Sequence, residues 1–363
     1  MGLLRLWLAF TVLRFHTTAM GSGWMPNGQA AVEAFFVLSG FAMAMVLEEK
    51  YQGALRRFWI QRFLKLWPAY IAALLLSLAF EIYLWNFRQA GAGVVQEFSG
   101  GPSPSFFSWV LIAFSNLSLI GQDLMILLGL NGQGRPVLAL ASSGASYSAI
   151  HYMVIPQAWS LSIELIFYAL APWYVRLSSR SLVAIAGAGI LLRLAFIAAD
   201  GSGNAWAYRV APIELPTFAL GILSWRAYRA MDKAEAGPLA PWRSLAGWAL
   251  MLLAPQVGGD MLLQSLALAL ATALALPWIF SASRRFSWDQ SLGEWAYPLY
   301  LLHHLLSYLG TDIARHLGVT PRFWVLALAS LAASALFWKL LQAPISALRR
   351  RLLKPVKGES FGS

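Results

Sequence analysis

The chain of 363 residues contains no cysteine, and only 12% of its residues are charged. The missing thiols exclude disulfide bonds, thiolate metal ligands and a cysteine nucleophile. Soluble domains carry about 25% charged residues. A chain that is 59% hydrophobic cannot cover its surface with polar groups in water. We therefore expect this chain to fold in lipid.

The few charges are unbalanced, because 27 basic and 16 acidic side chains give a net charge of +11. Such an excess can indicate a nucleic-acid partner. Here, however, the basic residues lie between apolar runs and not on one soluble face, which is typical of the cytoplasmic loops of a membrane protein. We expect a lipid bilayer as a partner and no nucleic acid.

Apolar runs long enough to cross a bilayer recur along the chain. A helix rises about 1.5 Å per residue, so about 20 residues cross about 30 Å of hydrocarbon. Ten runs fit this length: residues 3–20, 28–47, 67–86, 156–177, 181–199, 211–226, 244–258, 261–280, 292–311 and 323–345. The first has a faint likeness to a signal peptide, but Arg14 and His16 interrupt it and no clear cleavage site follows, so we expect it to be retained. The sequence predicts an all-α, polytopic membrane helix bundle of about ten transmembrane helices.

The basic residues predict how these spans are oriented. Eighteen of the 27 fall in one alternating set of loops and ends, and five fall in the opposite set. Because positive charge stays on the cytoplasmic side, both termini are predicted to be cytoplasmic. The expected location is the cell membrane (inner or plasma membrane), in a multi-pass arrangement. We divide the chain into a transmembrane domain, residues 1–345, and a basic cytoplasmic tail, residues 346–363.

The apolar segment 106–130 does not fit as a single further span. One crossing would move every later basic segment to the opposite side, including the run Arg349–Arg351. The segment must cross twice, re-enter, or lie at the outer interface, and its polar residues Asn116 and Asp123 favour a broken or interfacial helix. The surrounding region, residues 87–155, is rich in glycine, serine and proline. It is either a flexible loop or a lid over an acceptor site.

Charged groups inside the predicted spans are the first candidates for chemistry, since each costs about 2.5–3.5 kcal/mol at the centre of an inserted helix. The first span carries Arg5, Arg14 and His16. Arg5 and His16 are eleven residues apart, which is three helical turns plus about 20°, so they share a face and lie about 16 Å apart along the axis. Arg5 is predicted near the cytoplasm and His16 toward the outer side.

The second span carries Glu33 at about the same expected depth as His16. A short loop joins the two spans, so we expect a contact between the two side chains. A carboxylate would orient the imidazole, as in the pairs that activate a hydroxyl for acyl transfer. The alternative is a buried ion pair that only joins two helices. Gly40, on the same face as Glu33, would allow another helix or a thin ligand to approach closely.

The predicted inner loop, residues 48–66, gathers further positive charge in Arg56, Arg57, Arg62 and Lys65. One interpretation is an anchor on anionic lipid. The other is a clamp for the phosphates of a cytoplasmic nucleotide-like donor.

Five motifs stand in order along the chain. They are Arg5-x10-His16; Ala31-Val32-Glu33-Ala34-Phe35-Phe36-Val37-Leu38-Ser39-Gly40-Phe41; Arg62-x-x-Lys65-x-x-Pro68; Trp159-Ser160-Leu161-Ser162-Ile163-Glu164, followed by Phe167 and Tyr168; and Tyr297-Pro298-Leu299-Tyr300-Leu301-Leu302-His303. Together they resemble the motifs of the acyltransferase-3 family of membrane-bound, acyl-CoA-dependent O-acyltransferases. The resemblance runs from residue 5 to about residue 345.

The resemblance implies an integral membrane O-acyltransferase, most simply an O-acetyltransferase. It would move an acyl group from cytoplasmic acyl-CoA to a hydroxyl of an extracytoplasmic glycan or glycolipid. The donor, acetyl-CoA or another acyl-CoA, is a substrate, and no permanently bound cofactor is implied. His16 and Glu33 would be catalytic. Substrate binding would fall to Arg5, Arg14, Ser39, Arg62, Lys65, Glu164, Tyr168 and His303.

Some positions depart from the family pattern. Lys65 replaces an arginine, which weakens a bidentate grip on phosphate. Glu33 replaces an aspartate, and Leu165 stands where an acidic residue often follows the glutamate. Arg14 is an additional charge that could pair with Glu33 or Glu164, or contact the acceptor.

The other buried polar residues each have two interpretations. Glu164 and Tyr168 share a face and either line the site or pack helices together. Ser39 could be a nucleophile, but the sequence shows no adjacent base, which favours tight packing. Arg193 most simply neutralises Glu214 or another buried carboxylate. His303 is expected to line the site and His304 to pack or lie at an interface.

No His, Asp or Glu cluster has ligand spacing in the sequence, so no metal is predicted. Two other functions stay open. The first is a transporter or flippase for a glycan or lipid, since intramembrane charges also serve pathways, although no half-chain symmetry is visible. The second is a non-enzymatic membrane scaffold.

Overall fold

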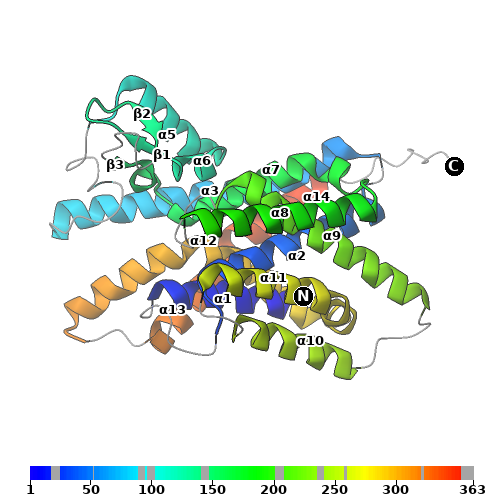
Figure 1. Ribbon diagram of the computed structural model, residues 1–363. Coiled ribbons are helices and arrows are strands. Elements are labelled where there is room, and N and C mark those ends of the chain that lie inside the picture. The colour runs from blue at the N-terminus through cyan, green and yellow to red at the C-terminus, as the bar shows by residue number, and fades with distance from the viewer. Residues whose placement is uncertain are drawn as a thin grey trace.

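A computed structural model describes residues 1–17, 25–51, 53–88, 95, 103–139, 147–200, 208–234, 241–256, 260–319 and 323–352. They form a bundle of helices with one small sheet beside it (Figure 1). The helices of the bundle are α1 (Gly2–Thr17), α2 (Gly28–Glu49), α3 (Leu55–Tyr83), α7 (Trp159–Tyr174), α8 (Ser179–Asp200), α9 (Ala211–Ala234), α10 (Pro241–Leu253), α11 (Met261–Ser283), α12 (Ser287–His316), α13 (Phe323–Phe337) and α14 (Ala343–Leu352).

The described residues of each predicted span fall mainly on these helices, and the last span, residues 323–345, runs through α13, the π-helix Trp338–Gln342 and the start of α14. Within the described ranges, five helical stretches are long and apolar enough to cross a membrane, namely Gly28–Glu49, Leu55–Phe87, Ser179–Ala198, Met261–Ser283 and Phe323–Arg351. The all-α membrane class is therefore confirmed, while the count of ten spans stays a prediction.

One predicted boundary is wrong. The segment 48–66 was expected to be a loop, but α3 begins at Leu55 and runs without interruption through Pro68. The basic residues of the predicted loop therefore stand on the first turns of a long helix. Their side chains are fixed relative to one another, as a binding site requires.

Side-chain caps define where several helices begin. The Asn27 side chain accepts a hydrogen bond from the Ala30 amide at 2.8 Å and caps α2. Asp260 does the same for α11, accepting from the Leu262 amide at 2.8 Å. Asp289, in the first turn of α12, accepts from the amides of Gly2 and Leu3 at 2.8 Å each. Because a residue of α12 caps α1, the two helices are held in register along their length.

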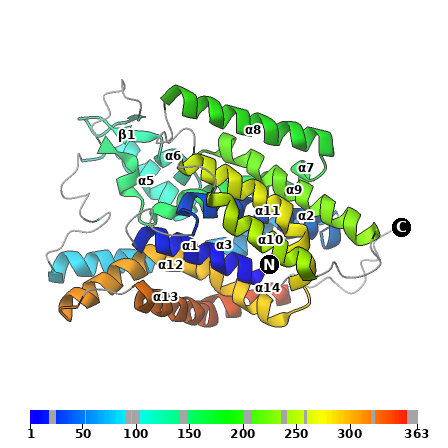
Figure 2. The same ribbon diagram turned by 60° about the horizontal axis from the view of Figure 1, so that its bottom comes forward.

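Helix α1 lies along α12, and α13 packs against α12 and also meets α1, where Phe10 contacts Phe323 and Trp324 (Figure 2). Helix α2 crosses α9 at two glycines. A β-carbon on Gly40 would come within 2.1 Å of the Phe218 carbonyl oxygen, and one on Gly221 within 2.0 Å of the Val37 carbonyl oxygen. The close approach predicted at Gly40 is confirmed, and its partner is α9.

The described part of the region between α3 and α7 forms a lobe, residues 103–139 and 147–158. It contains α5 (Phe106–Ser118), α6 (Gln122–Met125) and an antiparallel sheet of β1 (Leu128–Leu130), β2 (Pro136–Leu138) and β3 (Tyr147–Ser148), with β1 in the centre. Leu128 pairs with Leu138, and Gly129 pairs with both Val137 and Ser148. Figure 1 shows the lobe at one end of the bundle, above α3.

The apolar segment 106–130 is broken, as its polar residues predicted. Helix α5 has 13 residues and ends at Leu119, whose φ of 68° is left-handed. Such a helix is about 20 Å long, which is too short to cross the hydrocarbon. Phe106 and Phe107, on its exposed face, are 85% and 65% accessible. This exposed apolar face suits contact with lipid.

One hydrogen bond joins two parts of the lobe, and a second joins the lobe to the bundle. The Asn116 side-chain amide donates to the Tyr152 carbonyl at 2.9 Å. The Ser162 hydroxyl of α7 donates to Asp123 at 2.8 Å. The lobe thus holds the start of α7, where the Trp159–Glu164 motif lies.

Candidate functional site

A cavity of about 470 Å³ opens between α1, α2, α3, α7, α12 and α14. Five basic and two acidic side chains line it: Arg5, Lys50, Arg62, Lys65, Arg349, Glu164 and Glu294. The excess of positive charge, in a space with apolar walls, favours an anionic ligand that also carries an apolar part.

Two arginines in the wall have unused hydrogen-bonding capacity. The Nε atoms of Arg62 and Arg349 are buried and have no hydrogen-bond partner within the described residues. The Arg62 guanidinium carbon lies 5.6 Å from the centre of the Phe58 ring and 5.8 Å from that of Tyr168. A buried donor without a partner costs about 1–3 kcal/mol, and phosphate oxygens are acceptors that would remove this cost.

A network of polar side chains lies deeper in the same cavity. The Ser39 hydroxyl donates to Glu164 Oε1 at 2.6 Å, and the Tyr168 hydroxyl donates to the same oxygen. The predicted common face of Glu164 and Tyr168 is therefore confirmed, and both residues line the cavity. The sequence showed no base beside Ser39, whereas the structure places the Glu164 carboxylate there.

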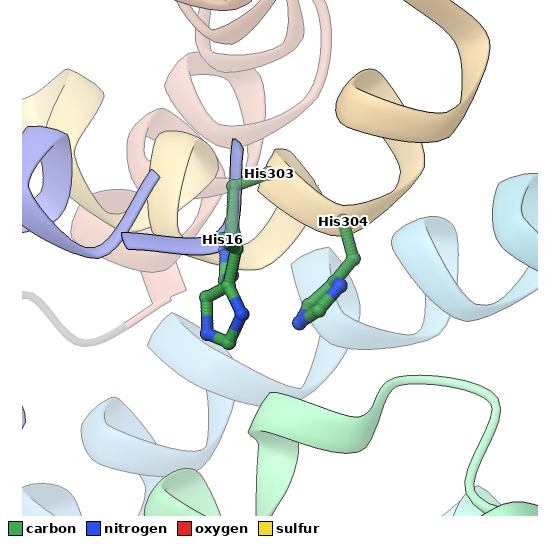
Figure 3. A group of neighbouring side chains, drawn as sticks. All are labelled: His16, His303 and His304. Carbon is green, nitrogen blue, oxygen red and sulfur yellow. The ribbon is translucent and has the colours of Figure 1, made fainter. Parts of the chain in front are cut away.

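Three histidines meet where the last turn of α1 approaches the middle of α12 (Figure 3). The ring of His16 lies 5.1 Å from that of His303 and 4.4 Å from that of His304, and the two α12 rings are 4.6 Å apart. One ring nitrogen from each lies within 4.8 Å of the others. We call these three residues the histidine cluster. The prediction that no cluster has ligand spacing is wrong. His304 lies where α1 meets α12, in agreement with the packing or interfacial position expected of it.

The histidine cluster has one member that is fully buried. His303 is 0% exposed, and its Nδ1 lies 2.6 Å from the Tyr300 carbonyl oxygen. A carbonyl oxygen can only accept, so Nδ1 carries the proton and Nε2 presents a lone pair. That Nε2 is buried without a hydrogen-bond partner in the described residues.

A single side chain links the cavity to the histidine cluster. Tyr300 lines the cavity, and its ring centre lies 5.8 Å from that of His303. The Tyr300 hydroxyl is held at 2.6 Å from the Ser160 hydroxyl and at 3.2 Å from the Gln157 carbonyl. Neither His16 nor His303 lines the cavity itself. The cavity thus ends one aromatic ring before the histidine cluster.

The predicted contact between Glu33 and His16 is wrong. Glu33 Oε2 lies 2.5 Å from Arg193, and its other oxygen has no hydrogen-bond partner in the described part of the chain. Arg193 also lies 3.1 Å from Glu214, and all three side chains are almost fully buried. This triad connects α2, α8 and α9. Arg193 neutralises Glu214 as predicted, and Glu33 belongs to the same ion network.

Arg14 does not line the cavity. Its two predicted partners bond other residues, since Glu33 pairs with Arg193 and Glu164 accepts from Ser39 and Tyr168. The sequence prediction of a substrate-binding role for Arg14 therefore has no cavity contact to support it.

Arg209 stands close to the histidine cluster, although nothing in the sequence singled it out. Its φ of 76° places the backbone in the left-handed region. Its guanidinium carbon lies 5.7 Å from the Trp159 ring and 5.4 Å from the Tyr208 ring, and it interacts electrostatically with His16. Arg209 thus supplies a positive charge close to both His16 and Tyr300, where an anion could be held.

The comparison with protein families decides the class. The acyltransferase-3 model, described as an acyltransferase domain, matches residues 1–339. The chain belongs to the acyltransferase-3 family. No curated protein and no solved structure matches it. Membership makes this a membrane acyltransferase. Several residues of the five sequence motifs line the cavity, among them Arg5, Arg62 and Glu164.

The family match leaves some of the site unexplained. Arg349 lies beyond residue 339 and was predicted to belong to a cytoplasmic tail, but α14 continues to Leu352 and brings it into the cavity wall. In the sequence, the basic run Arg349–Arg351 was the feature that drew attention to this segment. His304 and Arg209 gave no signal of this kind, since their roles depend on how α12 and the start of α9 meet α1.

Proposed function

We propose that this acyltransferase-3 protein is an O-acyltransferase, most simply an O-acetyltransferase, that uses acyl-CoA as donor and a hydroxyl of a glycan or glycolipid as acceptor. The observation that carries the proposal is the basic cavity with two unpartnered buried arginine Nε atoms. Its volume of about 470 Å³ lies within the range of about 300–1,000 Å³ typical of ligand pockets.

The cavity suits the separate parts of acyl-CoA. The phosphates would lie against Arg62, Lys65 and Arg349, because charge-assisted bonds to phosphate are the strongest that these side chains make. The slender pantetheine arm would pass the Ser39–Glu164 pair toward Tyr300. The thioester would then lie next to the ring that separates the cavity from the histidine cluster.

The acceptor hydroxyl would approach the histidine cluster from the other end of the bundle. His16 is the exposed member of the cluster, and we assign it the role of general base. Its imidazole takes the hydroxyl proton while the oxygen attacks the thioester carbonyl. The new C–O bond forms, the C–S bond breaks, and the CoA thiolate leaves and takes up a proton. Glu33 takes no part in this step, because it is committed to Arg193.

The proposal includes a membrane arrangement. With ten spans and both termini in the cytoplasm, the phosphate end of the cavity faces the cytoplasm, where acyl-CoA is made. His16, at the far end of α1, then lies toward the outer side, where the lobe also stands (Figures 1 and 2). The cell membrane is the location that this arrangement requires.

The experiment is transfer of label by the purified protein. Radiolabelled acetyl-CoA and a glycan or glycolipid extract are supplied to wild type, His16→Ala and His316→Ala, a control at the end of α12. We expect labelled ester from wild type and His316→Ala and at least about 100-fold less from His16→Ala, given the usual contribution of a general base. Full activity in His16→Ala would exclude the imidazole as base. Acceptor flux across liposomes without any ester would favour a transporter.

A further inference from the structure

The histidine cluster has a property that general base catalysis by one imidazole does not require. Three of the five histidines of the chain meet in it. They come from two helices, and α12 supplies two neighbouring residues whose rings form a triangle with the ring from α1 (Figure 3). A single base would need only His16.

The geometry of the cluster matches a three-histidine metal site. Two nitrogens bound to one tetrahedral Zn²⁺ at about 2.1 Å lie about 3.4 Å apart. The three ring nitrogens here lie within 4.8 Å of one another. Binding would require changes in the side-chain torsion angles that bring the three nitrogens about 1 Å closer, and His16, on the last turn of α1, is the most exposed of the three.

His303 shows the second feature of a ligand. Metal-binding histidines usually donate the N–H of the second ring nitrogen to a carbonyl or carboxylate, which orients the ring. His303 makes this bond from Nδ1 to the Tyr300 carbonyl at 2.6 Å. Its Nε2 is left buried, with a free lone pair and no hydrogen-bond partner in the described residues. Such an atom has a cost in the empty state that a bound cation would remove.

We propose that His16, His303 and His304 bind one divalent transition-metal ion of the Zn²⁺ class, leaving its fourth coordination position open. All three ligands are imidazoles, which suit Zn²⁺, Co²⁺ and Cu²⁺ and do not suit Mg²⁺ or Ca²⁺. Three protein ligands with one open position are typical of catalytic zinc sites, whereas structural sites use four.

The charged group acting on His16 from a neighbouring element is Arg209, which is itself a cation. Its charge opposes a bare dication and favours one that carries an anionic oxygen in the open position. Arg209 therefore favours an anionic oxygen ligand in the open fourth position of the ion. It does not stabilise an ion that lacks this ligand.

The metal site adds to the proposed function. Only the catalytic role of the ion rests on that proposed function. A bound ion would acidify an acceptor hydroxyl in place of the His16 imidazole. The hydroxyl proton would then pass to the CoA thiolate as the C–O bond forms and the C–S bond breaks. His16 would then be a ligand and not a free base. Binding of the ion can be measured whether or not acyl transfer occurs.

The test uses the full chain purified in detergent without metal-affinity steps, stripped with a chelator and titrated with Zn²⁺ or Co²⁺. Metal content, the visible spectrum of the Co²⁺ form and the melting temperature are recorded for wild type, His304→Ala and His16→Ala. The matched controls are His151→Ala and His316→Ala, the two histidines outside the cluster. We expect about one ion per chain, a four-coordinate Co²⁺ spectrum and a rise in melting temperature for wild type and both controls.

Removing the hydrogen-bond partner of a metal ligand typically weakens metal affinity by about 10- to 100-fold. Removing a ligand itself should weaken the Zn²⁺ affinity by more than that. His304→Ala and His16→Ala serve this test because neither ring is fully buried, so the fold should persist. Equal Zn²⁺ affinity in wild type and both cluster variants would overturn the site, as would a wild type that binds none.

The transfer assay separates this inference from the proposed function. Loss of transfer on chelation and recovery with Zn²⁺ would support both. Undiminished transfer by a metal-free protein would refute the catalytic role of the ion and leave the acyltransferase intact. Stoichiometric Zn²⁺ binding by a protein that never forms ester would support the site and refute the proposed function.

Discussion

Arg349 offers the sharpest test of how the donor is held, because it lies outside the family match and yet lines the cavity. Arg349→Met removes the guanidinium and keeps an unbranched side chain that can fill the same space. The helix should persist, since methionine and arginine have similar helix propensities.

The expected magnitude follows from the state of its Nε atom. That atom is buried without a partner in the described residues, so a phosphate oxygen would gain a charge-assisted hydrogen bond. Such bonds contribute about 1.5–3 kcal/mol. At 1.4 kcal/mol per factor of ten, the KM for acetyl-CoA should rise about 10- to 150-fold.

The assay measures initial rates of label transfer against acetyl-CoA concentration. Arg350→Met is the matched control, because Arg350 is the next residue of α14 and is exposed. Its KM should stay within about threefold of wild type, since an exposed charge contributes little. A second control uses S-acetylpantetheine, which lacks the nucleotide phosphates and should be used equally by wild type and Arg349→Met.

Equal increases in KM for Arg349→Met and Arg350→Met would refute the argument, because they would indicate a general effect of surface charge. The same rise with S-acetylpantetheine would also refute it, since the lost contact would then not be to phosphate.

Three further substitutions test the packing around the site. Arg193→Met leaves Glu33 and Glu214 buried and unpaired and should lower the free energy of unfolding by about 3–5 kcal/mol. Thermal unfolding in detergent measures this change. Arg180, on the same helix, is exposed, so Arg180→Met should leave the stability unchanged. Gly221→Leu should prevent folding, read as loss of the monodisperse peak on size exclusion, because its β-carbon would stand 2.0 Å from the Val37 carbonyl oxygen; a monodisperse, active variant would contradict the crossing. Tyr300→Phe should lower stability by about 1 kcal/mol, because the hydrogen bonds of the hydroxyl are lost. The KM for the donor should stay nearly unchanged, since the ring that ends the cavity remains. A KM as high as that of Arg349→Met would show that the hydroxyl itself binds the donor.

The helices could be predicted from the sequence because length and hydropathy are local properties. The described parts of all ten predicted ranges are mainly helical. The motif residues that meet at one cavity are Arg5, Ser39, Arg62, Lys65, Glu164 and Tyr168. The order of the motifs was enough to find these residues, since each motif stands on its own helix and those helices are neighbours in the bundle.

Contacts between helices could not be predicted in the same way. Equal depth suggested that Glu33 meets His16, but depth leaves the rotation of a helix about its axis open. The structure turns Glu33 toward Arg193, on the other side of α2. The part of His304 in the cluster could not be predicted for a related reason. Adjacent residues on a helix point about 100° apart, which suggested different surroundings for His303 and His304, yet the ring of His16 on α1 contacts both of their rings.

The most direct test of the central claim is a structure of the full chain with bound acetyl-CoA, determined by cryo-electron microscopy in lipid. We predict phosphate density beside Arg62 and Arg349 and the thioester next to Tyr300, on the side that faces His303. Donor density at another place on the protein, with these two guanidinium groups still unpartnered, would contradict the assignment of the cavity as the acyl-donor site.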